Sequence, residues 1–125
     1  MKLLQLLESA YIRDVSVKSL APDILSDIKR FAGTESGHVV LYGMVAAELV
    51  SKADPENLKV AKTHIKDSDR DECFNEVRDH ASNGTKYILL LHDKMIDGHH
   101  YLAKALHAGV TSSLGVLDIT PLKFQ

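Results

Sequence analysis

One stretch near the C-terminal end, residues 86–119, limits the possible folds more than any other part of the chain. Its apolar spacing changes from strand-like to a helical period of about 3.6 residues and then back to strand-like. The predicted elements are a strand at 87–91, a polar turn at 92–94, a short strand at 95–96, a helix from His99 that Gly109 ends, and a strand at 114–119. The stretch therefore predicts a hairpin, a tight corner, a helix and a returning strand.

The corner of this unit is Asp97-Gly98, which places backbone N–H groups at a helix N-terminus where an anion can bind. Asp97 has two interpretations. It could cap the helix by accepting from the N–H of His99 or His100, which stabilises a helix by about 1 kcal/mol. It could instead hold a divalent ion beside a phosphate, or act as a general base. Gly98 has no Cβ, so its backbone could approach a ligand closely.

Residues 96–105, IDGHHYLAKA, resemble the strand–Gly–His–helix motif of the ParB/sulfiredoxin-like superfamily. The resemblance extends over residues 85–120 and includes an N-terminal strand that ends in Leu20-Ala21-Pro22. Members of the superfamily bind nucleoside triphosphates at this helix start, and some are nucleases, kinases or sulfinic-acid reductases. The resemblance implies an α+β fold with a small mixed β-sheet and packed helices.

The same resemblance implies a nucleotide or phosphate site at the helix start, with a nucleoside triphosphate and magnesium as the implied cofactor. The implied binding residues are Gly98, His99, His100, Tyr101 and Lys104, and the implied catalytic residues are Asp97 and His100. Two positions depart from the family pattern. Tyr101 stands where the family has a phosphate-binding Arg, for which Lys104 could partly substitute. His99 stands where sulfiredoxin has its catalytic Cys, which excludes that chemistry.

Composition limits the classes of protein to which this chain can belong. At 125 residues, with 45% hydrophobic and 26% charged residues, it is expected to form one globular domain over residues 11–125. With a net charge of −2 the chain has no overall excess of basic residues, so nucleic-acid binding is not expected. No apolar run approaches the ~20 residues of a membrane span. Cys73 is the only cysteine, which favours a reducing, cytoplasmic location and a buried, inert thiol.

The first ten residues, MKLLQLLESA, have two interpretations. They could form a short amphipathic helix that docks on the domain. They also look like the short leader of tailed-phage proteins that are packaged into the prohead, since Leu6-Leu7-Glu8 is similar to the Leu-x-Glu cleavage signal of maturation proteases. The second interpretation implies phage structural proteins as partners and places the protein in the host cytoplasm or the virion.

Other segments carry weaker signals. We predict a strand at 11–20, a helix beginning at Ala21-Pro22-Asp23, a buried helix or a strand at 39–52, an edge strand or irregular crossing at 57–65, and a helix that begins with a capping box at Ser68-x-x-Asp71 and ends at Asn83-Gly84. The acids of that last helix are expected to form a solvated face.

The histidines suggest more than one role, because four of the seven lie between His92 and His107. His100, Lys104 and His107 share one helical face, which predicts a solvent-exposed stripe, while His99 falls on the core side. Adjacent helical side chains point about 100° apart, so His99 and His100 are not expected to chelate one metal ion. No metal site is predicted.

Two function classes remain open. One is a nucleotide- or phosphate-binding domain with phosphoryl-transfer or nuclease activity. The other is a non-enzymatic virion or interaction protein that keeps the fold. The intact Gly-His corner favours the first and the missing Arg favours the second, so the sequence does not decide whether the chain is an enzyme. A cleft at residues 97–101 would favour the first class.

Overall fold

The computed structural model describes residues 11–51, 55–65, 70–92, 94–110 and 114–122. The elements follow in this order: β1 (Tyr11–Ser16), the 3-10 helix η2 (Val17–Ser19), α2 (Pro22–Ala32), β2 (His38–Val45), α3 (Ala47–Val50), α4 (Pro55–Lys62), α5 (Arg70–Asn83), β3 (Ile88–Leu91), β4 (Lys94–Asp97), α6 (His99–Ala108) and β5 (Leu114–Asp118). Within these residues, no helix is both long and apolar enough to cross a membrane.

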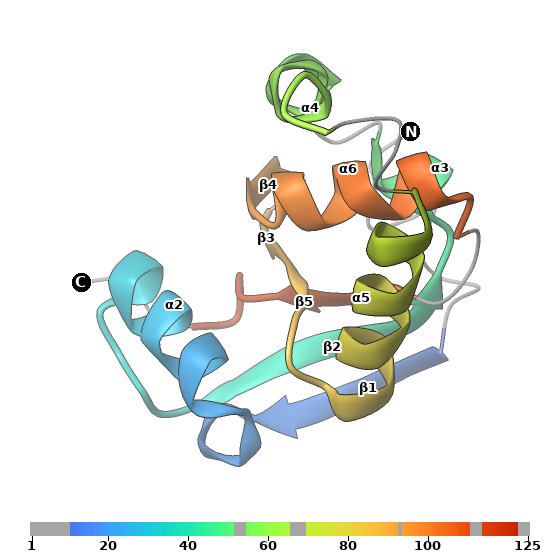
Figure 1. Cartoon of the computed structure of the whole chain (residues 1–125). Helices are drawn as coiled ribbons and strands as arrows, with labels where there is room; N and C mark the ends of the chain where they lie inside the picture. Colours follow the sequence, from blue (N-terminus) through green and yellow to red (C-terminus); the bar gives the residue numbers. More distant parts are fainter. Residues whose placement is uncertain (1–10, 52–54, 66–69, 93, 111–113, 123–125) are drawn as a thin grey trace.

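The strands form one mixed sheet in the order β1-β2-β5-β3-β4 (Figure 1). Neighbouring strands are antiparallel except β5 and β3, which are parallel. A parallel pair needs a crossover connection, and here the connection between β3 and β5 consists of β4 and α6. The α+β class with a mixed sheet and packed helices is confirmed, and so is the order of elements predicted for residues 86–119.

Helices cover both faces of the sheet, and each face has its own core. Successive residues of a strand point to opposite faces. Leu89 and Leu117 accordingly pack with α2 on one face, whereas Ile88, Leu90 and Val116 pack with α5 and α6 on the other. Helix α6 packs between α5 and α4, and Figure 1 shows α4 on the far side of α6 from the sheet. The start of α6 lies beside β3, because Gly98 lies close to the Ile88 backbone.

The predicted N-terminal strand is too long. Its pairing with β2 ends at Ser16, which lies opposite His38. The residues that precede His38 form the loop between α2 and β2. Residues 17–20 therefore have no strand to pair with. Val17 instead donates its N–H to the Gly37 carbonyl, and Leu20 donates to Val17 to close the η2 turn.

In the middle of the chain, the prediction for residues 57–65 is wrong, and the open prediction for residues 39–52 resolves into a strand followed by a short helix. Residues 39–52, for which a buried helix or a strand is predicted, contain both: residues 39–45 belong to β2, and Ala47–Val50 form the short helix α3. Because β2 lies between β1 and β5 and is covered on both faces, its apolar residues lack the alternation of a half-buried strand. Residues 57–65, predicted as an edge strand or crossing, lie mostly in α4, where Leu58 and Ala61 form a buried i, i+3 pair.

The helix α5 largely follows its prediction. Cys73 is buried, as expected, and so is Val77, whereas Phe74 is 44% exposed. Most of its described acids are exposed, but Glu76 is half-buried against α6. The leader at residues 1–10, its cleavage signal and the capping box at Ser68 lie outside the described residues.

Candidate functional site

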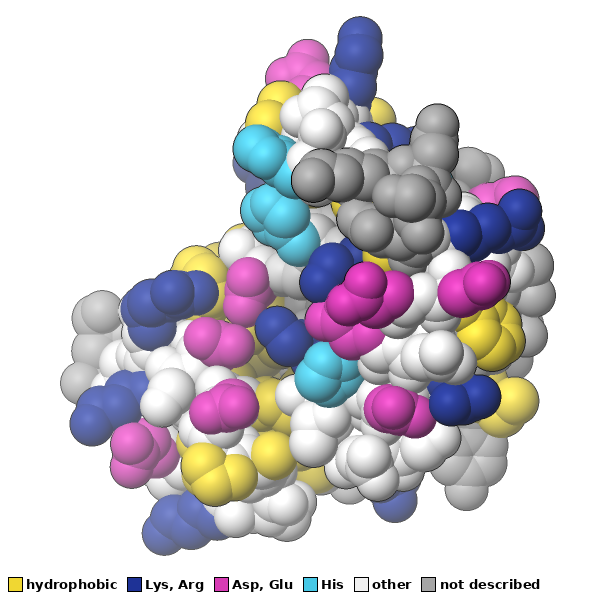
Figure 2. Space-filling model, in the orientation of Figure 1, with side chains coloured by type: hydrophobic (Ala, Val, Ile, Leu, Met, Phe, Trp, Pro, Cys, Tyr) yellow, Lys and Arg dark blue, Asp and Glu magenta, His cyan; other side chains and the backbone are white. Residues whose placement is uncertain are grey.

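A cleft of about 450 Å³ opens at the start of α6. Helix α2 forms one wall, and residues at the start of β3 and the β4–α6 corner form the other. The lining residues are Asp23, Ile24, Ser26, Asp27, Thr85, Lys86, Tyr87, Leu89, Asp97, Gly98, His99, His100 and Tyr101. Figure 2 shows acidic and basic side chains next to one another on this face, between α2 and α5. The corner at residues 97–101 is thus open to a ligand.

The cap of α6 differs from the prediction for Asp97. Asp97 is the last residue of β4 and lies opposite Leu89, so the strand and not the helix sets its direction. Gly98 takes the cap position with φ +100°, and among the described residues no side chain makes a capping hydrogen bond there. The cap interpretation of Asp97 is therefore wrong. The first-turn N–H groups of a helix have no intrahelical acceptor, so a ligand can use them.

Gly98 is required by packing against β3. A β-carbon built at this position would lie 3.0 Å from the Ile88 Cα and 3.4 Å from the Tyr87 carbonyl oxygen. Real side chains also rarely adopt a φ of +100°. The hydrogen that replaces the side chain of Gly98 thus faces a neighbouring strand, so the glycine itself does not report close approach of a ligand.

The two adjacent histidines separate at the cleft rim. His99 is half-buried and lines the cleft, whereas it was expected on the core side. His100 is exposed, and its ring centroid lies 5.7 Å from that of His64, which follows α4. Only His99 and His100 of the seven histidines line this cleft.

Tyr101, at the position for which the sequence resemblance implies an Arg, is 6% exposed. Its hydroxyl donates to the Val77 carbonyl of α5 at 3.5 Å, and its ring meets the His80 ring at 6.0 Å in an edge-on arrangement. Burial, with a smaller contribution from Tyr87, raises the pKa of Tyr101 to about 12. The side chain is therefore neutral at ordinary pH and offers a phosphate no positive charge.

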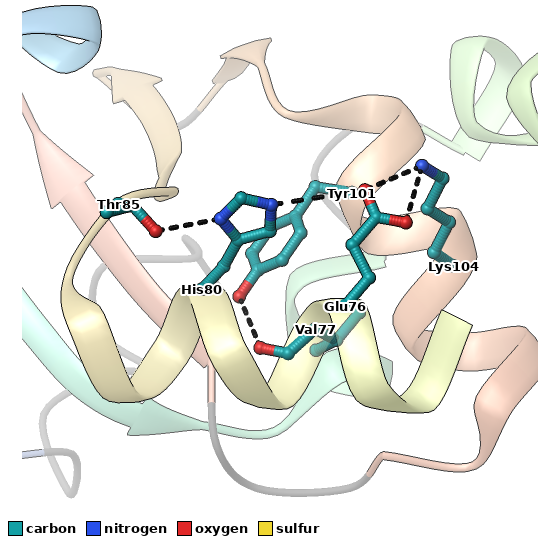
Figure 3. A network of polar contacts seen from close by, with 6 residues as sticks. All are labelled: Glu76, Val77, His80, Thr85, Tyr101 and Lys104. Carbon is teal, nitrogen blue, oxygen red and sulfur yellow. Dashed lines mark hydrogen bonds and ion pairs between the residues drawn. The ribbon is translucent and has the colours of Figure 1, made fainter. Parts of the chain in front are cut away.

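Lys104 does not line the cleft. Its Nζ lies 2.9 and 3.0 Å from the two carboxylate oxygens of Glu76, so it joins α6 to α5 (Figure 3). His107 is half-buried, and its Nε2 is buried with no hydrogen-bond partner among the described residues. The exposed stripe predicted for His100, Lys104 and His107 is wrong, because α4 and α5 pack on either side of α6 and leave only His100 exposed.

Among the described residues, three carboxylates line this cleft, and only Asp97 of these was predicted as a site residue. Asp23 and Asp27 come from α2, and Arg30 of the same helix lies 3.8 Å from Asp27 and 3.9 Å from Asp97. The pKa of Asp27 is raised by partial burial and by the Asp97 charge, while Arg30 and Lys86 act in the opposite direction. The Asp27 and Asp97 carboxylates therefore interact with each other and with the same Arg30 side chain.

Lys86 is the cation in the cleft lining that sequence reasoning missed. It directly precedes the predicted strand at 87–91, and an isolated lysine there carries no motif. The described residues contain no group of three or more His, Cys, Asp or Glu side chains arranged to hold a metal ion.

Searches of protein-family models, curated proteins and solved structures find no match for this chain. The resemblance of residues 96–105 to the ParB/sulfiredoxin-like superfamily therefore stays a prediction.

Proposed function

We propose that the chain is a ParB/sulfiredoxin-like domain that binds a magnesium–nucleoside triphosphate in the cleft at the start of α6. One observation carries this proposal: the corner expected to bind phosphate opens into a cleft and is not covered by packed protein. A cleft of about 450 Å³ falls within the range of small-molecule sites.

The phosphates would lie against the first turn of α6, where backbone N–H groups and the helix dipole favour negative charge. His99 and His100 begin that turn, and Lys86 on the neighbouring segment adds a cation. In this arrangement Lys86 takes the part that the resemblance would give to an Arg at position 101, since Lys104 is engaged by Glu76.

Because the cleft is lined by carboxylates, the nucleotide would bind as its magnesium complex. Asp23, Asp27 and Asp97 would repel bare phosphates, but magnesium is usually held by one or two carboxylates together with the phosphates of the substrate. Asp97 and Asp27 suit that role because they are close enough for the charge of Asp97 to raise the pKa of Asp27. When bound, magnesium would neutralise phosphate charge.

Among the activities of the superfamily, phosphoryl transfer fits this cleft better than nuclease activity. The acidic lining and the net charge of −2 disfavour a polynucleotide backbone. Asp97 and His100 remain candidate site residues, because both lie at the corner where the phosphates would bind.

Isothermal titration calorimetry with ATP, CTP and GTP, each with magnesium, tests this proposal. Lys86→Gln should weaken binding about tenfold or more, since a charge-assisted hydrogen bond contributes about 1.5–3 kcal/mol. Lys59→Gln, an exposed lysine of α4 outside the cleft lining, is the matched control and should leave affinity unchanged. A folded wild-type protein that binds none of the three nucleotides at millimolar concentration would refute the proposal.

A second candidate is a non-enzymatic phage component, and exposed apolar residues favour it. Ile12 in the edge strand β1 is 46% exposed and Met44 in the neighbouring strand β2 is 74% exposed. Exposed apolar residues on an edge strand and on the strand beside it suit a protein partner. Stoichiometric recovery of the chain in purified virions, together with no nucleotide binding, would support this candidate over the first.

A further inference from the structure

A hydroxyl, an imidazole and a carboxylate lie in a row beside the cleft (Figure 3). Thr85 Oγ1 is 2.8 Å from His80 Nδ1, and His80 Nε2 is 3.9 Å from Glu76 Oε1. Thr85 lines the cleft, whereas His80 and Glu76 lie behind it on α5. A nucleophile bonded to a base, with a third group that orients the base, is the arrangement of an activated hydroxyl.

The third group favours the tautomer that this chemistry needs. Glu76 Oε1 lies 3.9 Å from His80 Nε2, beyond hydrogen-bond distance, but its negative charge favours the proton of a neutral His80 ring on Nε2. Nδ1 then has its lone pair directed at the Thr85 hydroxyl and can accept its proton. Lys104 binds both oxygens of Glu76, which holds that carboxylate in place beside the imidazole.

The position of the ring is also restrained. Tyr101 packs edge-on against His80, with an interplanar angle of 86°. Thr85 donates its backbone N–H to the His80 carbonyl at 3.2 Å, which keeps the hydroxyl over the end of α5. The hydroxyl and its base are thus held together before any ligand binds.

The hydroxyl lies near the proposed phosphate position. A β-carbon at Gly98 would lie 3.0 Å from the Ile88 Cα and 3.4 Å from the Tyr87 carbonyl oxygen, so this corner lies beside the Tyr87–Ile88 backbone, and Thr85 is two residues before Tyr87. Two residues of extended chain span at most about 7 Å. Thr85 and the first turn of α6 both line the same cleft, so a triphosphate held at that turn has Thr85 within its reach.

We propose that Thr85 accepts a phosphoryl group from the bound nucleoside triphosphate, an inference that rests on the proposed nucleotide binding. Thr85 Oγ1 forms a bond to the γ-phosphorus, and the bond from that phosphorus to the β–γ bridging oxygen breaks. The proton of the hydroxyl passes to His80 Nδ1, and the nucleoside diphosphate leaves with the bridging oxygen. His80 is the general base, and Glu76 is a positioning residue.

The test uses the full chain incubated with ATP and magnesium, followed by intact-mass analysis and peptide mapping. We expect a mass increase of one phosphoryl group, located on Thr85. Thr85→Val should abolish it, and Thr85→Ser, which keeps a hydroxyl, should retain it. Thr63→Val is the matched control, because Thr63 lies after α4 outside the cleft lining and bonds to the Val60 carbonyl.

The role of the base is tested by rate. His80→Gln should slow phosphorylation by about 100-fold or more, the usual contribution of general-base catalysis, without an equal loss of nucleotide affinity. Calorimetry on the same samples separates the two proposals. Nucleotide binding with no phosphoryl group, or with the group on another residue, would overturn this inference and leave the proposed function standing. No nucleotide binding would overturn both.

Discussion

The backbone of Gly98 lies so close to β3 that a β-carbon at this position would be 3.0 Å from the Ile88 Cα. The close approach joins the corner of the cleft to the middle of the sheet. Any side chain at position 98 must move backbone atoms of β3, which cannot rotate away as a flexible side chain would.

We therefore expect Gly98→Ala to destabilise the fold by about 1–3 kcal/mol, the range for a residue forced into a strained backbone conformation. Urea unfolding measures this loss. Gly109→Ala is the control, because its β-carbon would meet only the movable Arg70 guanidinium at 3.3 Å, with φ +74°. Equal losses at both positions would show that the contact with Ile88 adds nothing to the conformational strain. Because Gly98→Ala is expected to destabilise the fold, loss of ligand binding in this variant would not distinguish misfolding from a blocked site.

The two leucines of α6 should differ in their contribution to stability. Leu102 is fully buried, so Leu102→Ala should cost about 2–5 kcal/mol. Leu106 is half-buried at the cavity beside α4, so its truncation removes less area from water and should cost about 1–2 kcal/mol. His100→Ala, at an exposed position, should cost under about 0.5 kcal/mol. Urea melts of the three variants would contradict this assignment of the helix face if the Leu106 loss matched or exceeded that of Leu102.

Elements with their own start and stop residues could be predicted from the sequence. Pro22 begins α2, and Gly109 ends α6 in the left-handed conformation, with φ +74°. These signals act within a few residues, so they do not depend on the rest of the fold. The strand β2 has no such local start and stop signals. Burial on both faces removed its alternation, so the apolar residues at 39–52 fitted a buried helix as well as a strand.

The candidate site divides in the same way. The corner at residues 97–101 is contiguous, so its exposure to a ligand could be anticipated from one motif. Asp27 and Lys86 join it only because the topology brings α2 and the start of β3 to the same cleft. Lys104 was expected in the site but binds Glu76, since the packing of α5 against α6 depends on contacts between distant segments.

Tyr101 should make stability fall at alkaline pH. Its folded-state pKa is about 12, against 10.0 for an ordinary tyrosine, so the unfolded chain loses this proton first. Stability is therefore complete below pH 10 and declines as pH rises above it. The loss from this group should reach about 1.4 kcal/mol one pH unit above 10. Tyr101→Phe lacks the group, so the difference between wild type and variant in urea melts should change by that amount between pH 8 and pH 11. A constant difference would show that the phenol is not desolvated.

Asp27 should reduce stability at neutral pH when magnesium and nucleotide are absent. Its folded-state pKa is raised by burial and by Asp97, so ionisation is less favourable in the folded state than in the unfolded chain. The stability of the wild type should therefore fall as pH rises through the raised pKa. Asp27→Asn removes this penalty and should unfold at a higher urea concentration than wild type at pH 7.

The advantage of Asp27→Asn should disappear near pH 3, where the wild-type carboxyl is protonated in both states. Asp14→Asn, an exposed aspartate of β1, should show no comparable gain at pH 7 and is the matched control. A variant less stable than wild type at pH 7 would mean that the ion pair with Arg30, 3.8 Å away, outweighs the repulsion from Asp97. If Asp27 helps to hold magnesium, the variant that gains stability without ligand should also bind the magnesium–nucleotide more weakly, because the same carboxylate that is unfavourable in the empty cleft is favourable beside the cation.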